Sequence, residues 1–227
     1  MHRHRPIVLA AATALIALAS AGARSAVAVG IDAGTLGIGP EVQLALTHSL
    51  NLRLGVAAFS YSRNVTDTDV TYDGTLKLAN GFGMLEWHPG GSIFKLAIGA
   101  VGTANKVDVD GVPTGGSYQL GDNTYPASDI GTVTGKLKVG SGIAPYVGIG
   151  VGNPLADGSH FKVQFDVGVM YTGAPKAEIV ATCAAAVPAP TCAQIQADVL
   201  VEINKLEQQS TQLKVWPVIN LGVAYRF

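Results

Sequence analysis

The chain has 227 residues, of which 48% are apolar and only 14% are charged. The charged fraction is low for a soluble domain. A net charge of −1 provides no bulk attraction to nucleic acid, so we expect no nucleic-acid partner. Only one apolar run approaches the length of a membrane-spanning helix, which argues against a helical membrane bundle.

The first 23 residues have the three parts of a secretory signal peptide. "MHRHR" is basic, residues 6–20 are apolar, and Ala21, Gly22 and Ala23 are small residues suited to cleavage. A membrane anchor is the alternative, but the apolar run is short and leads directly into small residues. We therefore predict a cleaved signal peptide at 1–23 and one exported domain at 24–227.

From Val27 onward the apolar residues recur at every second position, which is the period of a β-strand. The window 133–151 ("VTGKLKVGSGIAPYVGIGV") alternates over 19 residues, far beyond the typical soluble strand of about 5–6. A tilted strand that crosses a bilayer needs about 9–11 residues. The predicted strands are 26–34, 36–46, 50–57, 76–89, 93–100, 133–151, 161–171 and 217–227.

The facing of one predicted strand stays open. In 76–89 the apolar residues Leu76, Leu78, Phe82 and Met84 share one face with Asn80 and Glu86. A β-bulge near Asn80-Gly81 would switch the facing along this strand.

The connections alternate between short and long. Segments 47–49, 88–92 and 153–159 are short and rich in turn residues, whereas 63–73, 105–131 and 173–212 are long. Short turns on one side and long loops on the other are typical of outer-membrane barrels. We predict an all-β fold: an eight-stranded antiparallel up-and-down transmembrane β-barrel with short periplasmic turns, long outer loops and one short helix in the last loop. This count requires a tight "GTLG" connection after the strand at 26–34.

The last strand carries a resemblance to a known class. "INLGVAYRF" resembles the C-terminal targeting strand of Gram-negative outer-membrane barrels, with Leu221, Val223 and Tyr225 placed two residues apart before Phe227. Together with "GTLGIG", "LRLGV", "EWHP" and "APYVGIG", it makes the chain similar to small proteobacterial barrels of the OmpA-transmembrane-domain or OmpW-like size class. The resemblance implies that the barrel-assembly machinery reads these four residues, and that the protein lies in the outer membrane. We expect no peptidoglycan-binding domain after the barrel.

The residues opposite the apolar face are candidates for a polar network in the lumen. An eight-stranded barrel is just wide enough to be filled by side chains. An ion-paired plug that stabilises the fold is the first interpretation, and a selective path for small solutes is the second. The candidates are Asp32, Glu41, Gln43, Arg53, Lys95, Lys136, Lys138, Tyr146, Lys162, Gln164, Asp166 and Arg226.

The two cysteines, Cys183 and Cys192, both lie in the last long loop. In an oxidising compartment an even, closely spaced pair favours a disulfide. No His or further Cys pair lies nearby to complete a zinc site, and the spacing is not that of a C-x-x-C redox motif. We predict a Cys183–Cys192 disulfide.

A helix is predicted directly after these cysteines, at about 193–208. Thr191 and Gln194 fit a capping box. The apolar face of this helix would pack over the barrel rim or mouth, and it comprises Ile195, Val199, Ile203 and Leu206. A flexible acidic loop with a fraying helix is the alternative.

We predict a monomeric outer-membrane protein with a structural or surface-interaction role, without catalytic activity, cofactor or metal. The expected partners are outer-membrane lipid, lipopolysaccharide and, during biogenesis, the assembly machinery; the acidic long loops could bind divalent cations that bridge lipopolysaccharide phosphates. A narrow channel for small solutes is the alternative. A lipid-modifying enzyme comes third, because His48-Ser49, Ser159-His160 and His88 all fall in predicted turns, and sequence adjacency does not make a nucleophile–base pair.

Overall fold

The computed structural model describes residues 26–67, 70–113, 116–120, 122–209 and 214–227. The predicted signal peptide at 1–23 therefore lies outside the described residues. Among the described residues, no helix is both long enough and apolar enough to cross a membrane.

Eight antiparallel strands form a closed ring, so the predicted barrel is confirmed. The ring runs β8-β5-β4-β3-β2-β1-β11-β9 and closes through the pairing of β9 with β8. Its strands are β1 Val27–Gly34, β2 Gly37–Ala45, β3 Leu50–Asp67, β4 Val70–Trp87, β5 Phe94–Pro113, β8 Ile130–Val151, β9 Phe161–Tyr171 and β11 Val215–Arg226. The remaining elements are η2 Pro89–Gly91, β6 Ser117–Leu120, β7 Asn123–Pro126, η3 Ala127–Asp129, β10 Lys176–Cys183 and α2 Ala189–Gln209.

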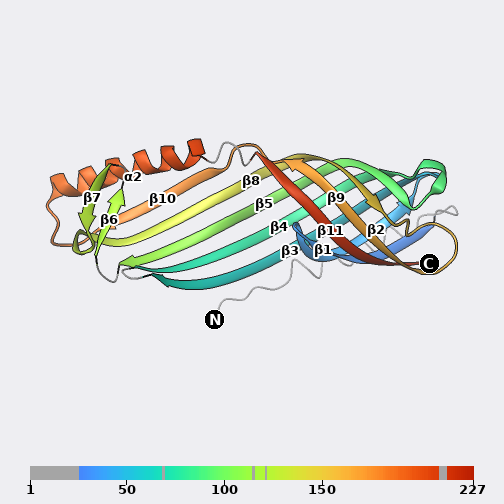
Figure 1. The fold of residues 1–227 in the computed structure, drawn as a ribbon, viewed down its shortest axis with the longest axis horizontal. Coiled ribbons are helices and arrows are strands. Elements are labelled where there is room, and N and C mark those ends of the chain that lie inside the picture. The colour runs from blue at the N-terminus through green and yellow to red at the C-terminus, as the bar shows by residue number, and fades with distance from the viewer. Residues whose placement is uncertain (1–25, 68–69, 114–115, 121, 210–213) are drawn as a thin grey trace.

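One side of the barrel continues far beyond the ring (Figure 1). Strands β3, β4, β5 and β8 have 18 to 22 residues, whereas β1, β2, β9 and β11 have 8 to 12. Strand β10 adds to the free edge of β8, so the continuation is an open five-stranded sheet, which we call the extension. Segments 63–73 and 105–131 were predicted as loops but largely form strands here. Their Val, Thr and Tyr residues suit paired strands, and the hairpin β3–β4 stays in register up to Asp67 and Val70.

A β-bulge in β8 reverses which residues face outward. Thr103 pairs with Gly142 but Asn105 pairs with Val139, so β8 holds one extra residue between these pairs. Gly140 and Gly142 have φ angles of 77° and 111°, a region that side chains rarely allow. In β4, by contrast, the pairing with β3 is continuous through Asn80 and Gly81, so the suggested bulge is not there.

At the β10–β8 edge of the extension, α2 and the hairpin β6–β7 pack against the sheet (Figure 1). Ile195 and Val199 of α2 are buried against Ala181 of β10 and Ile130 of β8. Ile203 packs against the same cluster, as predicted, whereas the Leu206 side chain lies outside the described side chains. The helix is longer than expected and begins at Ala189, so Thr191 lies within its first turn rather than capping it.

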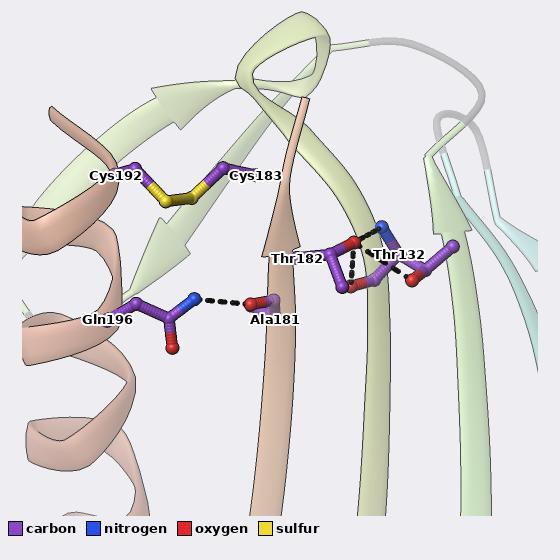
Figure 2. The surroundings of a disulfide bond; sticks show 6 residues. All are labelled: Thr132, Ala181, Thr182, Cys183, Cys192 and Gln196. Carbon is purple, nitrogen blue, oxygen red and sulfur yellow. Dashed lines mark hydrogen bonds between the residues drawn. A yellow bond between two sulfur atoms is a disulfide. The ribbon is translucent and has the colours of Figure 1, made fainter. Parts of the chain in front are cut away.

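A disulfide joins Cys183 at the end of β10 to Cys192 in the first turn of α2 (Figure 2). Near it, Gln196 donates a hydrogen bond to the Ala181 carbonyl, and Thr182 of β10 bonds Thr132 of β8 through their hydroxyls at 3.0 Å. Closing so short a loop restrains the unfolded segment by about 2–3 kcal/mol on the chain-entropy model. The covalent link and the hydrogen bonds together hold the start of α2 on the extension.

The contact between α2 and the hairpin is expected to depend on pH. Asp198 accepts hydrogen bonds from Tyr125 and, at 2.9 Å, from Asn123, and the Tyr125 bond holds the pKa of Asp198 below its ordinary value. A lowered folded-state pKa stabilises the fold above the unfolded pKa, and that stabilisation is lost as pH falls through the folded pKa. We expect hydrogen-exchange protection of α2 amides to fall below about pH 4. Asp198→Asn should remove this pH dependence; an unchanged profile in that variant would contradict the assignment.

Candidate functional site

The barrel interior holds a layer of charged side chains that is almost completely shielded from solvent. Each of these residues is at most 2% exposed. The layer, here called the ionic layer, consists of Asp32, Glu41, Arg53, Glu86, Lys95 and Asp166. Six strands contribute one charged residue each at the same level of the barrel, because every strand points alternate residues inward. These strands are β1, β2, β3, β4, β5 and β9.

Arg53 lies at the centre of the ionic layer. Its Nε is 2.9 Å from Glu86 and its guanidinium nitrogen is 2.9 Å from Asp166. Asp32 and Glu41 are each 3.6 Å from the same guanidinium nitrogen. One cation therefore faces all four buried carboxylates. Removing it would leave an uncompensated charge in a place that water does not reach.

Lys95 is the second cation of the layer. Its Nζ lies 3.0 Å from Glu86 and 2.9 Å from Asp166. Two glutamines link the remaining oxygens: Gln43 donates to Gln164 at 2.8 Å, and Gln164 donates in turn to Glu41. The layer is thus a connected network of ion pairs and hydrogen bonds, as an interior plug requires.

An apolar layer lies beside the ionic layer in the same interior. Arg53 is at the boundary, with its guanidinium 5.7 Å from the Phe82 ring centroid. Tyr146, predicted as a lumen residue, belongs to this apolar cluster and is buried. The cluster comprises Leu36, Ala57, Phe82, Met84, Ala97, Val101, Ala144, Tyr146, Met170 and Val218, with Trp216 packed against it.

Lys162 and Arg226 lie at the end of the barrel that carries the short turns. Arg226 forms an ion pair of 3.0 Å with Asp157 and donates to the Leu155 carbonyl, while Lys162 donates to the Asp157 carbonyl. Leu155 closes this end by packing against Ala28 and Ala224. These two cations therefore anchor the 153–159 turn and do not belong to the ionic layer.

Lys136 and Lys138 do not face the interior, which corrects the sequence-based assignment. The bulge at Gly140–Gly142 shifts the alternation of β8, so these lysines lie on the outward face of the extension. Lys138 pairs there with Glu178 of β10. A single inserted residue is enough to reverse the facing of every residue beyond it.

The histidines near the short turns contact backbone groups. His88 is buried, with Nδ1 at 3.0 Å from the Ser92 carbonyl, and His160 Nδ1 lies 2.8 Å from the Arg226 carbonyl. His48 lies next to Gly91 in the neighbouring turn. Among the described residues, no group of three or more His, Cys, Asp or Glu residues could hold a metal ion. These histidines fix the turns in place.

The proposed assembly residues Leu221, Val223, Tyr225 and Phe227 all point outward from β11 and are exposed. Tyr225 packs edge-on against Phe161 at 4.9 Å and Phe227 at 5.2 Å, and stacks on His160 at 5.5 Å. This aromatic cluster suits a membrane interface. The role of β11 in assembly stays a prediction.

Sequence reasoning missed Glu86 as a member of the ionic layer and Phe82 and Met84 as interior residues. The signal was present, because all three share one face of β4 with Asn80, which is also buried. Alternation alone predicts that an apolar residue on a barrel strand faces lipid. In this interior, however, large apolar side chains fill the space that the ionic layer leaves.

Comparisons with known proteins agree with this architecture. No protein-family model matches the chain, and no curated protein matches it. Solved structures share its fold. CarO2 of Acinetobacter baumannii superposes with a TM-score of 0.60 at 20% identity, covering 90% of this chain and 100% of that chain. CarO of the same organism gives 0.58 at 22% identity, covering 88% and 97%. At these identities the likeness concerns the fold alone, and the chain is therefore an all-β barrel of the architecture seen in the CarO structures.

Proposed function

We propose that this protein is an outer-membrane β-barrel with a sealed interior that displays its extension at the cell surface, in a structural or surface-interaction role. One observation carries the proposal: the ring has its charges buried inside and exposes large apolar side chains over its outer surface. Ile31, Ile98 and Ile149 are 60% or more exposed, whereas Arg53 and Glu86 are fully buried. A soluble barrel has the opposite arrangement, and only lipid makes this one favourable.

We infer the orientation of the barrel from its two unlike ends. The turns at 46–49, 88–93 and 152–160 lie at the same end as Phe227, and the extension with α2 lies at the other end (Figure 1). Short turns face the periplasm in barrels of this class. The extension, α2 and the hairpin β6–β7 would then stand on the outer surface, where they form a rigid platform tied by the disulfide.

A sealed interior is supported by the burial of the ionic layer and by the apolar cluster beside it. Ions would have to pass side chains that are already paired with one another, such as Arg53 with Asp166. In planar bilayers we expect the purified protein to insert without stepwise conductance. Fractionation should place it in the outer membrane as a barrel whose gel mobility changes on boiling. Recovery in the soluble fraction would contradict the proposal.

A narrow cation-selective path is the second candidate function. It is favoured by the excess of carboxylates in the ionic layer, where Asp32, Glu41, Glu86 and Asp166 face only Arg53 and Lys95. Small, cation-selective steps in the same bilayer recordings would support the path. Their loss in Glu41→Gln, with insertion unchanged, would assign them to this layer.

A further inference from the structure

The outward face of the extension carries a row of four lysines on four adjacent strands. Lys77 of β4 is the cross-strand partner of Lys106 of β5, which is the partner of Lys138 of β8, which is the partner of Lys176 of β10. We call these residues the lysine row. Like charges placed directly opposite one another destabilise a sheet. The lysine row therefore lowers the stability of the folded sheet rather than raising it.

The lysine row is only partly neutralised by the chain. Asp108 is shared between Lys77 at 2.9 Å and Lys106 at 3.6 Å, and Glu178 pairs with Lys138. The side chains of Lys77, Lys106 and Lys138 are 38–47% exposed, so their ammonium groups remain accessible. Lys176 is exposed and makes no ion pair with any described residue. Positive charge is therefore left over along the row.

The position of the row matches the outer edge of the apolar belt. Trp87 ends β4 at the turn end, and Lys77 lies ten residues before it on the same outward face. Ten residues at about 3.3 Å, tilted by about 40°, rise roughly 25 Å, which is the height of the apolar band in outer-membrane barrels. Between the two, the outward positions of β4 are Ala79, Gly81, Gly83 and Leu85, none of them charged. The first charge above the belt is therefore the lysine row.

A groove on the same face adds further hydrogen-bond donors. It has a volume of about 390 Å³. Its polar lining consists of Lys77, Lys106 and Lys136, the carboxylates Asp108, Asp110 and Glu178, and the hydroxyls of Thr75 and Thr134. Ammonium and hydroxyl groups are suited to phosphate oxygens. Asp108 and Glu178 each pair with lysines of the row and so limit the mutual repulsion of the ammonium groups.

We propose that the lysine row and its groove bind the phosphates of a phosphorylated glycolipid of the outer leaflet, with the acyl chains lying on the apolar belt below. The proposal names a partner for the proposed outer-membrane barrel and rests on that function. It differs from the sequence-based expectation, in which acidic loops reached the same lipid through divalent cations. Here lysines contact the phosphates directly, on the one side of the barrel where the sheet leaves the membrane.

The test uses the full mature chain refolded in detergent and native mass spectrometry. Bisphosphorylated lipid A is the probe, with dephosphorylated lipid A and inorganic phosphate as comparisons. Wild type should retain one bisphosphorylated lipid A, and Lys106→Gln/Lys138→Gln should bind it roughly ten- to thirtyfold more weakly, because each lysine near an anionic surface contributes about a fivefold step. Lys205→Gln/Lys214→Gln, which removes two lysines away from the row, should bind as wild type does.

Several outcomes would overturn the proposal. Equal retention by the two double variants would exclude the lysine row, and equal binding of dephosphorylated lipid A would show that acyl chains alone are recognised. Displacement by millimolar inorganic phosphate would indicate a free-anion site. If the row variant fails to fold, the salt dependence of wild-type binding tests the proposal instead. Phosphate contacts weaken strongly between about 0.1 and 0.5 M NaCl, so lipid A binding that stays unchanged over this range would overturn it. Lipid binding is measured in micelles and does not depend on where the protein lies in the cell. A failure to bind lipid A would therefore overturn this proposal alone, and fractionation tests the outer-membrane location separately.

Discussion

Replacing Arg53 with methionine is expected to be the most destabilising single change in the barrel. The substitution keeps much of the side-chain volume but removes the cation that faces Asp32, Glu41, Glu86 and Asp166. Breaking a buried ion pair from one side costs about 3–5 kcal/mol, because the partner is left charged in a medium of low polarity. Against a total stability of about 5–15 kcal/mol, this loss should populate unfolded protein at moderate urea. The urea midpoint, followed by tryptophan fluorescence in detergent, measures it.

The matched control for this variant is Arg63→Met. Arg63 is on the same strand, β3, but lies exposed on the extension. Its replacement should change stability by no more than about 0.5 kcal/mol. Equal effects of the two substitutions would show that the ionic layer contributes nothing particular to the barrel.

A compensating variant separates charge from shape. Adding Asp32→Asn and Glu41→Gln to Arg53→Met leaves Lys95 with Glu86 and Asp166, which it already contacts at 3.0 and 2.9 Å. The ratio of carboxylates to cations is then the same as in the native layer. We expect this triple variant to recover part of the urea midpoint. No recovery would indicate that the packing of Arg53 against Phe82, rather than its charge, holds the barrel.

The second large effect is expected for Ile195→Ala in α2. The Ile195 side chain of α2 is fully buried against β10 and the hairpin β6–β7. Truncating a buried isoleucine costs about 2–5 kcal/mol, and here the loss falls on the docking of one helix. We expect α2 to open locally, so that trypsin cleaves after Lys205 much faster in the folded protein. The barrel itself should keep its urea midpoint.

Leu200→Ala is the control for that experiment. Leu200 lies on the same helix with 62% of its surface exposed, so truncating it removes little packing. Cleavage after Lys205 should stay close to the wild-type rate. If both variants are cleaved equally fast, α2 is held by the Cys183–Cys192 disulfide alone and not by its apolar face.

The eight strands of the ring and the helix could be predicted from sequence because each depends on local information. Alternation in 161–171 and 133–151 produced strands β9 and β8 with nearly the same bounds. The cysteine pair and the apolar spacing of Ile195, Val199 and Ile203 predicted α2 and its buried face, but over the barrel rim or mouth, whereas this face packs on β10 and β8 of the extension. These features follow from the period of the chain and from short-range chemistry, which neighbouring residues determine.

Only the tertiary structure decided whether each residue faces the barrel interior or the outside, and which side chains it contacts. One extra residue at Gly140–Gly142 turned Lys136 and Lys138 outward, and the unbroken register of β4 turned Glu86 and Met84 inward. The lysine row exists only because four strands pair in one register, although its members are spread over a hundred residues of sequence. Alternation determines that two faces exist. Strand pairing and ring closure determine which face is inside, and these depend on hydrogen bonds between strands that no local pattern contains.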